Sequence, residues 1–203
     1  NDKTFIVDAM SSFGGIPIDM EKNNIDYLIS SSNKCLHGPP GISFCIANED
    51  KLKNLNNESK TLSLDLKEQY DFLEKNNQFR FTPPTHIVNA LNESIIELKN
   101  IGIEERNSVY KYYNSKIKES LLELNFKNYE LERNSNIIST WHYPNENFDF
   151  NHFYNFLEEN NILIYPGKLL NEAVFRIGNI GNLRDEDIEY FINNIKKYKN
   201  CYL

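Results

Sequence analysis

The segment from Tyr27 to Ala47 constrains the fold of this chain more than any other stretch. It contains two apolar runs, residues 27–29 and 42–47, with a small polar turn and a Gly-Pro-Pro-Gly corner between them. Such a pattern predicts two buried strands joined by a loop. Lys34 lies in that loop, just past the carboxyl end of the first strand, and in an open α/β sheet ligands bind at this edge. A lysine in such a position is most often simply solvated, so its function depends on what else lies there.

A carboxylate is predicted at the same edge of the sheet. A third strand-like run begins at Thr4 and ends at Asp8. Residues 16–26 are long enough for a crossover, so the strands that precede Asp8 and Lys34 can run parallel. An amine and a carboxylate would then face one crevice, although an aspartate that ends a strand is also a common turn or N-cap residue.

This pair of groups suits one kind of cofactor chemistry. A lysine in a partly desolvated pocket can lose its proton and form a Schiff base with a carbonyl cofactor. A carboxylate can keep a pyridine nitrogen protonated, so that the ring accepts electrons. A lysine and a carboxylate placed like Lys34 and Asp8 are the two groups that a protein contributes to pyridoxal-phosphate chemistry.

Five motifs, in order along the chain, carry a family resemblance: IVDAMSSFGGIPID, SSSNKCLHGPPG, FRFTPPTH, IYPGK and FRIGNIG. With them the chain resembles the 2-aminoethylphosphonate:pyruvate transaminases, which are class V aminotransferases of the fold type I pyridoxal-phosphate family. The resemblance is weaker at residues 48–77 and 116–136, and it covers only the back half of a family member. It implies an α/β fold, with residues 1–102 as the C-terminal part of the cofactor-binding large domain and its sheet. Residues 103–203 would form a small αβ C-terminal domain.

The resemblance also assigns residues in the two loops. Lys34 would be the catalytic lysine that binds the cofactor, and Asp8 would hold the ring nitrogen. Met10, two residues beyond Asp8, would point to the same side of an extended segment and pack on one face of the ring, although it could equally be core filler. Ser12 could bond a phosphate or cap a helix, and Asn33 could orient either the cofactor phosphate or the loop.

Two assigned residues lie outside these loops. By resemblance, Thr82 reaches the cofactor phosphate of the neighbouring subunit, which implies a homodimer with shared active sites; by itself it reads as a turn residue. Arg176 lies between apolar strand residues, where an unpaired guanidinium is unfavourable, so it needs an anion or an acidic partner. The resemblance makes that anion the acidic group of the substrate, and a structural salt bridge is the alternative.

The implied reaction transfers the amino group of 2-aminoethylphosphonate to pyruvate and gives phosphonoacetaldehyde and L-alanine. Two other interpretations stay open. Another class V aminotransferase, acting on glyoxylate or serine, would share Lys34, Asp8 and Arg176. Alternatively, this piece is no enzyme by itself, because the glycine-rich phosphate loop and the aromatic residue stacked on the cofactor would lie in the absent half.

Composition excludes several classes of protein. The net charge is −7 with scattered basic residues, which argues against nucleic-acid binding, and no apolar run has the roughly 20 residues of a membrane helix. The histidines show no metal-ligand spacing, so no metal is expected. Three irregularly spaced cysteines and no signal peptide favour a reducing cytoplasm. Because the chain begins at Asn1 without a methionine, we expect a piece of a longer polypeptide.

Periodicity predicts the remaining elements. The polar stretch 49–78 is expected to be a surface excursion followed by a helix, and the prolines at 83 and 84 to precede a helix that lasts to about Gly102. Further helices are expected at 103–124, 150–160 and 185–199, with strands at 137–142, 162–165 and 174–177. Lys168 is expected to be a solvated turn residue.

Overall fold

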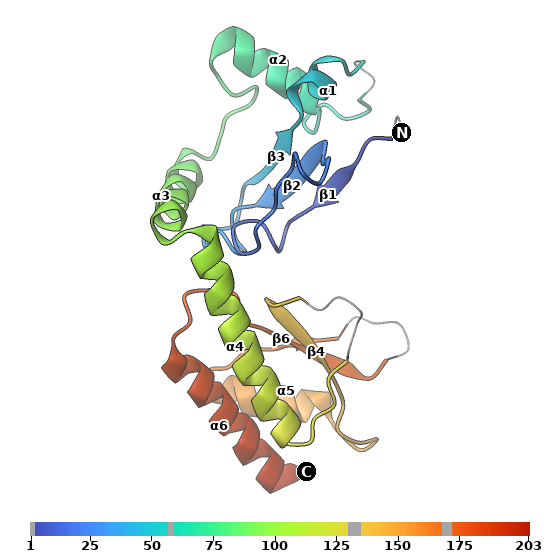
Figure 1. Ribbon diagram of the computed structural model, residues 1–203, viewed down its shortest axis with the longest axis vertical. Coiled ribbons are helices and arrows are strands. Elements are labelled where there is room, and N and C mark those ends of the chain that lie inside the picture. The colour runs from blue at the N-terminus through green and yellow to red at the C-terminus, as the bar shows by residue number, and fades with distance from the viewer. Residues whose placement is uncertain (1–2, 57–58, 130–134, 168–171) are drawn as a thin grey trace. The chain divides into compact units, whose positions relative to one another are not determined.

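The computed structural model describes residues 3–56, 59–129, 135–167 and 172–203, so Lys168 lies outside the described residues. The chain divides into two compact units, Asn1–Gly102 and Ile103–Leu203 (Figure 1). Each unit has a three-stranded sheet of its own. None of the helices in the described ranges is long and apolar enough to span a membrane.

The sheet of the first unit is built around its second strand. The strands are β1 (Ile6–Asp8), β2 (Tyr27–Ser31) and β3 (Ser43–Ala47), in the order β1-β2-β3. β1 runs parallel to β2, which confirms the predicted crossover, and β3 runs antiparallel to it. Because β2 is paired on both sides, it is the most buried of the three strands.

Three helices follow the sheet in the first unit: α1 (Glu49–Lys53), α2 (Leu66–Asn76) and α3 (Thr85–Ile101). The side chain of Asp65 caps α2 by accepting the N–H of Glu68, and α2 ends at Asn77 in the left-handed conformation. The predicted helix after the two prolines is confirmed as α3. The hydrophobic cluster of this unit is small, and its buried members are Ala9, Ile25 and Leu28.

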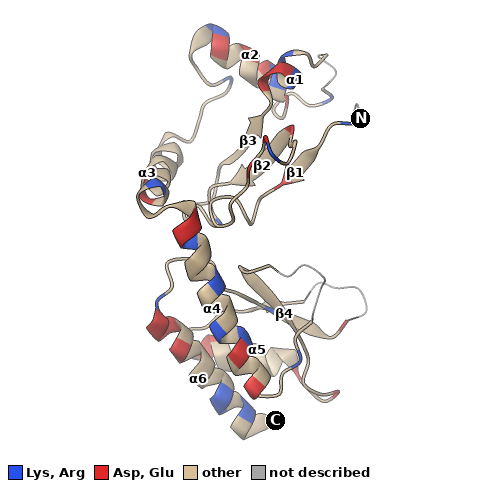
Figure 2. Cartoon of the chain, viewed as in Figure 1, with Lys and Arg blue, Asp and Glu red and all other residues tan. Residues whose placement is uncertain are grey.

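The second unit combines helices with an antiparallel sheet. Its elements are α4 (Ile103–Glu123), β4 (Ile138–His142), α5 (Phe150–Glu159), β5 (Tyr165–Pro166), β6 (Val174–Gly178) and α6 (Asp185–Tyr202). The sheet has the order β4-β6-β5, so β6 is its central strand. Figure 2 shows acidic residues at the start of α6 and basic residues toward its end, as the helix dipole favours.

An extensive aromatic and aliphatic core holds the second unit together. Trp141, Phe153 and Phe175 are fully buried in it. Phe153 contacts Phe175 edge to face at 5.4 Å between ring centroids and lies 4.7 Å from the ring of Tyr198 in α6. Sheet, α5 and α6 therefore share one core, whose burial is the main stabilising contribution.

The predicted strand at 162–165 is wrong over most of its length. Of residues 162–165, Tyr165 alone pairs with β6, and Pro166 continues this short strand. Asn161 adopts a left-handed conformation, and the N–H of Ile162 donates to the carbonyl of Leu157 at 2.9 Å. Ile162 thus completes a Schellman cap of α5, and its backbone donor is not available to a sheet.

Candidate functional site

Asp8 and Lys34 belong to the same edge of the first sheet. Asp8 is the last residue of β1, and Lys34 follows the end of the parallel strand β2 at Ser31. Both side chains are exposed. Among the residues that the structure describes, neither forms an ion pair within 4.0 Å, with the other or with a third group. The chain thus presents an amine and a carboxylate that its own described side chains leave without ionic partners.

The loop after Asp8 is a tight turn. One carboxylate oxygen of Asp8 accepts the N–H of Met10 at 2.9 Å, and the carbonyl of Ala9 accepts the N–H groups of Ser12 and Phe13 at 3.1 and 3.0 Å. The expectation that Met10 continues an extended segment is therefore wrong, because the Asp8 side chain and these main-chain bonds bend the backbone. Met10 and Ser12 are half-buried.

The loop that carries Lys34 is closed by its own backbone. The N–H of Gly38 donates to the carbonyl of Ser32 at 2.8 Å, and the N–H of His37 donates to the carbonyl of Lys34 at 2.9 Å. The Ser31 hydroxyl donates to the amide oxygen of the exposed Asn33 at 2.9 Å. These bonds hold the backbone of Lys34 while its side chain stays exposed.

Sequence reasoning missed the buried residues that support these two loops. Ser30 and Ser32 are fully buried, and their hydroxyls donate to the carbonyls of Ala9 and Pro39 respectively. Cys35 is also fully buried, and its thiol donates to the carbonyl of Ser11 at 3.1 Å. The available signal was three consecutive serines at the end of an apolar strand, where hydroxyls need partners on burial.

Thr82 lies in the irregular segment between α2 and α3 and is exposed. The neighbouring Arg80 donates to the carbonyl of Leu62 at 2.8 Å, and its guanidinium lies 5.3 Å from the centre of the Phe81 ring. Thr82 is thus held by a locally ordered segment and leaves its hydroxyl accessible.

Arg176 lies on the central strand β6 of the second unit, opposite Thr140 and Tyr165. It is half-buried, and its Nε donates to the carbonyl of Pro166 at 3.3 Å. No carboxylate within the described ranges lies within 4.0 Å of it, so the alternative of a structural salt bridge finds no support there. The remaining N–H groups of the guanidinium suit a bidentate anion.

A buried asparagine fixes the strand that carries Arg176. Asn179 is 1% exposed, and its amide donates to the carbonyls of Tyr110 and Asn136 at 3.0 and 3.1 Å. Its amide oxygen accepts a hydrogen bond from Asn114 at 3.2 Å. The end of β6 is thereby tied to α4 and to the segment before β4.

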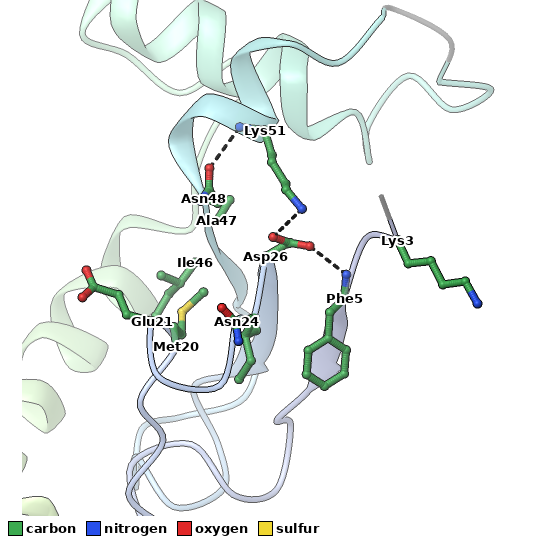
Figure 3. Close-up of a pocket in the computed structure, with 11 residues that line it drawn as sticks. Lys3, Phe5, Met20, Glu21, Asn24, Asp26, Ile46, Ala47, Asn48 and Lys51 are labelled. Atoms are coloured by element: carbon green, nitrogen blue, oxygen red, sulfur yellow. Dashed lines mark hydrogen bonds and ion pairs between the residues drawn. The ribbon is translucent and has the colours of Figure 1, made fainter. Parts of the chain in front are cut away.

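A hollow of about 920 Å³ in the first unit lies away from this edge. Asp26, which directly precedes β2, lines it (Figure 3). Lys34 follows the other end of that strand. The carboxylate of Asp26 forms an ion pair with Lys51 at 2.7 Å and accepts the N–H of Phe5 at 2.8 Å. Hydrogen bonding from Lys51 and Phe5 lowers the pKa of Asp26 from its ordinary value of 3.8. These contacts give the Asp26 carboxylate a structural role.

Comparison with solved structures defines the class of fold. An alanine–glyoxylate aminotransferase from Nostoc superposes with a TM-score of 0.86 at 22% identity, over 96% of this chain and 53% of that one. A pyridoxamine–pyruvate aminotransferase from Mesorhizobium loti gives 0.85 at 19% identity, over 97% and 52%. The predicted fold class, part of a fold type I pyridoxal-phosphate-dependent transferase, is confirmed.

Sequence comparison gives the family. The family described as "Aminotransferase class-V" matches residues 1–182, and the chain belongs to this family. It is 44% identical over 197 residues to a 2-aminoethylphosphonate–pyruvate transaminase from Phocaeicola vulgatus, covering 96% of this chain and 54% of that protein. It is 45% identical over 203 residues to a bifunctional phosphonoacetaldehyde hydrolase/aminoethylphosphonate transaminase from Clostridioides difficile, covering 98% and 32%. The chain spans about half the length, or less, of these relatives. Membership in the family implies pyridoxal phosphate as cofactor.

Proposed function

We propose that this chain supplies the catalytic lysine and the substrate-binding arginine of a 2-aminoethylphosphonate:pyruvate transaminase. One observation carries the proposal: a lysine and a carboxylate without ionic partners among the described residues follow neighbouring parallel strands at one sheet edge. Identities of 41–45% to proteins named for this activity support the substrate.

The residues at this edge fit pyridoxal phosphate. Lys34 would bind its aldehyde carbon, and Asp8, whose second carboxylate oxygen has no described partner, would hold the pyridine nitrogen. Met10 would contact the ring, while Ser12, Asn33 and, from the neighbouring subunit, Thr82 would bind the phosphate. When bound, the cofactor supplies a conjugated ring that accepts the electron pair released from the substrate carbon.

Lys34 would then act as the general acid and base. Its free amine would take the proton from the substrate carbon that bears nitrogen and would deliver it to the adjacent carbon C4′ of the cofactor. Asp8 keeps the proton on the ring nitrogen, since a negative charge at hydrogen-bond distance favours the charged form. The loop bonds hold the carboxylate of Asp8 and the backbone of Lys34, while the Lys34 side chain is left able to move.

Arg176 would bind the anionic tail of the substrate. The planar N–H groups of its guanidinium match either a phosphonate or the carboxylate of pyruvate. One guanidinium can therefore bind the amino-donor substrate and the amino-acceptor substrate in turn. The name of the Clostridioides difficile relative joins this transaminase to a hydrolase of phosphonoacetaldehyde, the product of the proposed reaction. The two named activities are chemically consecutive, which further supports 2-aminoethylphosphonate as amino donor.

We also propose a homodimer with shared active sites. Large apolar side chains are exposed close to Thr82 in sequence, at Phe79 and Phe81, and also at Leu62 and Leu64, as expected for a surface that a second subunit covers. The carbonyl of Leu62 accepts a hydrogen bond from Arg80, two residues before Thr82. Mixing Lys34→Ala and Thr82→Ala subunits tests this arrangement. A shared site predicts activity above that of either variant alone, because one site of each mixed dimer then has both residues intact.

The 203 residues by themselves are proposed to be inactive or barely active. β1 is an edge strand with Phe5 and Ile6 about half exposed, which fits a sheet that continues in a part of the protein outside this chain. Measurable transamination by the purified 203-residue chain would contradict this. Cys35, Cys45 and Cys201 form no disulfide in the described chain, which supports a reducing cytoplasm as its location.

An absorbance experiment on the complete polypeptide tests the proposed function. Pyridoxal phosphate should produce a visible band in the wild type and in a Lys51→Ala control but not in Lys34→Ala, and borohydride reduction should leave the cofactor on the peptide that contains Lys34. Adding 2-aminoethylphosphonate should convert the band. Conversion by alanine or serine but not by this donor would favour a glyoxylate-linked class V enzyme, and a band that persists in Lys34→Ala would refute the proposal.

A further inference from the structure

Two fully buried side chains from the Lys34 side of the site reach the loop that follows Asp8. Ser30, on β2, donates its hydroxyl to the carbonyl of Ala9 at 3.1 Å. Cys35, directly after Lys34, donates its thiol to the carbonyl of Ser11 at 3.1 Å. These two carbonyls lie on either side of Met10 in sequence, so the loop is held on both sides of that residue.

The two loops are also packed without space between them. Gly14 has φ +85°, and a Cβ at this position would lie 2.8 Å from Leu36 Cδ2 and 3.4 Å from the Cys35 carbonyl oxygen. The positive φ favours glycine here, and a Cβ would force the end of the Leu36 side chain to move. The Ala9 N–H also donates to the Ile29 carbonyl at 2.8 Å, which extends the β1–β2 pairing by one residue.

The neighbouring serines have different partners. The Ser31 hydroxyl bonds Asn33, and the Ser32 hydroxyl bonds Pro39, so both act within the Lys34 loop. Among the described side chains of this region, Ser30 and Cys35 donate the hydrogen bonds that cross to the Asp8 loop.

We propose that Ser30 and Cys35 are positioning residues that fix the carboxylate of Asp8 relative to the amine of Lys34. The inference rests on the proposed function for its catalytic meaning. The clamp itself, Ser30 to Ala9 and Cys35 to Ser11, belongs to the chain and can be tested without any cofactor.

The first test uses thiol labelling of the cofactor-free protein. Cys35 is fully buried, whereas Cys201 is exposed and provides an internal reference. Ser30→Ala removes one of the two contacts and should raise the labelling rate of Cys35 about fivefold, the effect of one typical hydrogen bond. Ser59→Ala, at an exposed serine whose bonds stay local, is the matched control and should leave the rate unchanged. An unchanged Cys35 rate in Ser30→Ala would refute the clamp.

The second test measures its effect on the cofactor. Ser30→Ala and Cys35→Ala should each weaken equilibrium binding of pyridoxal phosphate about fivefold and shift the pH midpoint of the Lys34-dependent band. Cys35→Ser, which keeps a donor, should stay within about twofold of wild type, as should Cys45→Ala. Equal losses in Cys35→Ser and Cys35→Ala, or a midpoint that moves in neither alanine variant, would overturn the positioning role. If wild type forms no Lys34-dependent band, the proposed function fails, while the labelling test still decides the clamp.

Discussion

Among single residues, Asp26 gives the clearest dependence on pH. Its pKa in the folded chain lies below the ordinary value of 3.8, because Lys51 and the Phe5 N–H stabilise the carboxylate. The unfolded state therefore binds the proton more readily, and stability falls as pH drops through the interval between the two pKa values. The contribution is complete above about pH 4.

We expect Asp26→Asn to be less stable than wild type at neutral pH and the difference to narrow below about pH 4. Urea midpoints measured from pH 7 downward test this. Glu21→Gln, at an exposed carboxylate that lines the same hollow, is the control and should show no such convergence. A gap between wild type and Asp26→Asn that stays constant into the acid range would contradict the assignment.

Asn179 supports a second prediction at this scale. Asn179→Ala removes the hydrogen bonds to Tyr110, Asn136 and Asn114 and leaves buried polar groups without partners. We expect a loss of about 2–4 kcal/mol in the free energy of unfolding. Asn147→Ala, at an exposed position, should change it by less than about 0.5 kcal/mol. Chemical denaturation of both variants measures the difference, and similar midpoints would show that the network contributes little.

At the scale of single elements, α5 depends on its N-cap. Asp149 accepts the N–H groups of Asn151 and His152 at 2.8 and 3.3 Å, which satisfies two donors of the first turn. Asp149→Ala should destabilise the chain by about 1 kcal/mol, whereas Asp149→Asn removes the charge and keeps a capping oxygen. Thermal melting of the two variants separates capping from charge. If both lose the same stability, the cap is not the cause.

Elements were predictable from the sequence where local pattern decides them. The strands that lead to Asp8 and Lys34, and their parallel pairing, follow from apolar runs and from the length of the crossover. The prediction of a strand from Ile162 was wrong because the Ile162 N–H donates to the cap of α5 and not to a neighbouring strand. The apolar character of the residues does not indicate which of the two bonds forms. The prediction that Met10 continues an extended segment was wrong for a similar reason. The Asp8 side chain accepts a hydrogen bond from the Met10 N–H and bends the backbone, and the periodicity of the sequence does not indicate this bond.

In the candidate site, too, some residues could be predicted from the sequence and others could not. Asp8 and Lys34 were found because strand ends can be read locally. Ser30 and Cys35 contact residues 21 and 24 positions away, so only the folded chain brings them to the Asp8 loop. Their supporting role could not be inferred from spacing, although buried hydroxyls at a strand end implied that partners existed.

For the whole molecule, the two units differ in how much core each one has. The described part of the second unit has an extensive cluster of buried aromatic and aliphatic side chains. The described part of the first unit has a small hydrophobic cluster, and β1 lies unpaired on one side at the edge of its sheet. We expect residues 103–203, expressed alone, to unfold cooperatively, and residues 1–102 alone to melt at a lower temperature or without cooperativity. Calorimetry of both pieces beside the full chain tests this. A higher melting temperature for 1–102 would contradict it.

The loop that contains Lys34 also limits which insertions and deletions this protein can accept in evolution. Ser31 pairs with Ser43, and residues 32–42 fill the span between them with bonds that close at Gly38 and Pro39. Gaining or losing one residue here would slip β3 against β2 and turn each of its side chains to the opposite face. The length of this loop is therefore constrained together with the identity of Lys34.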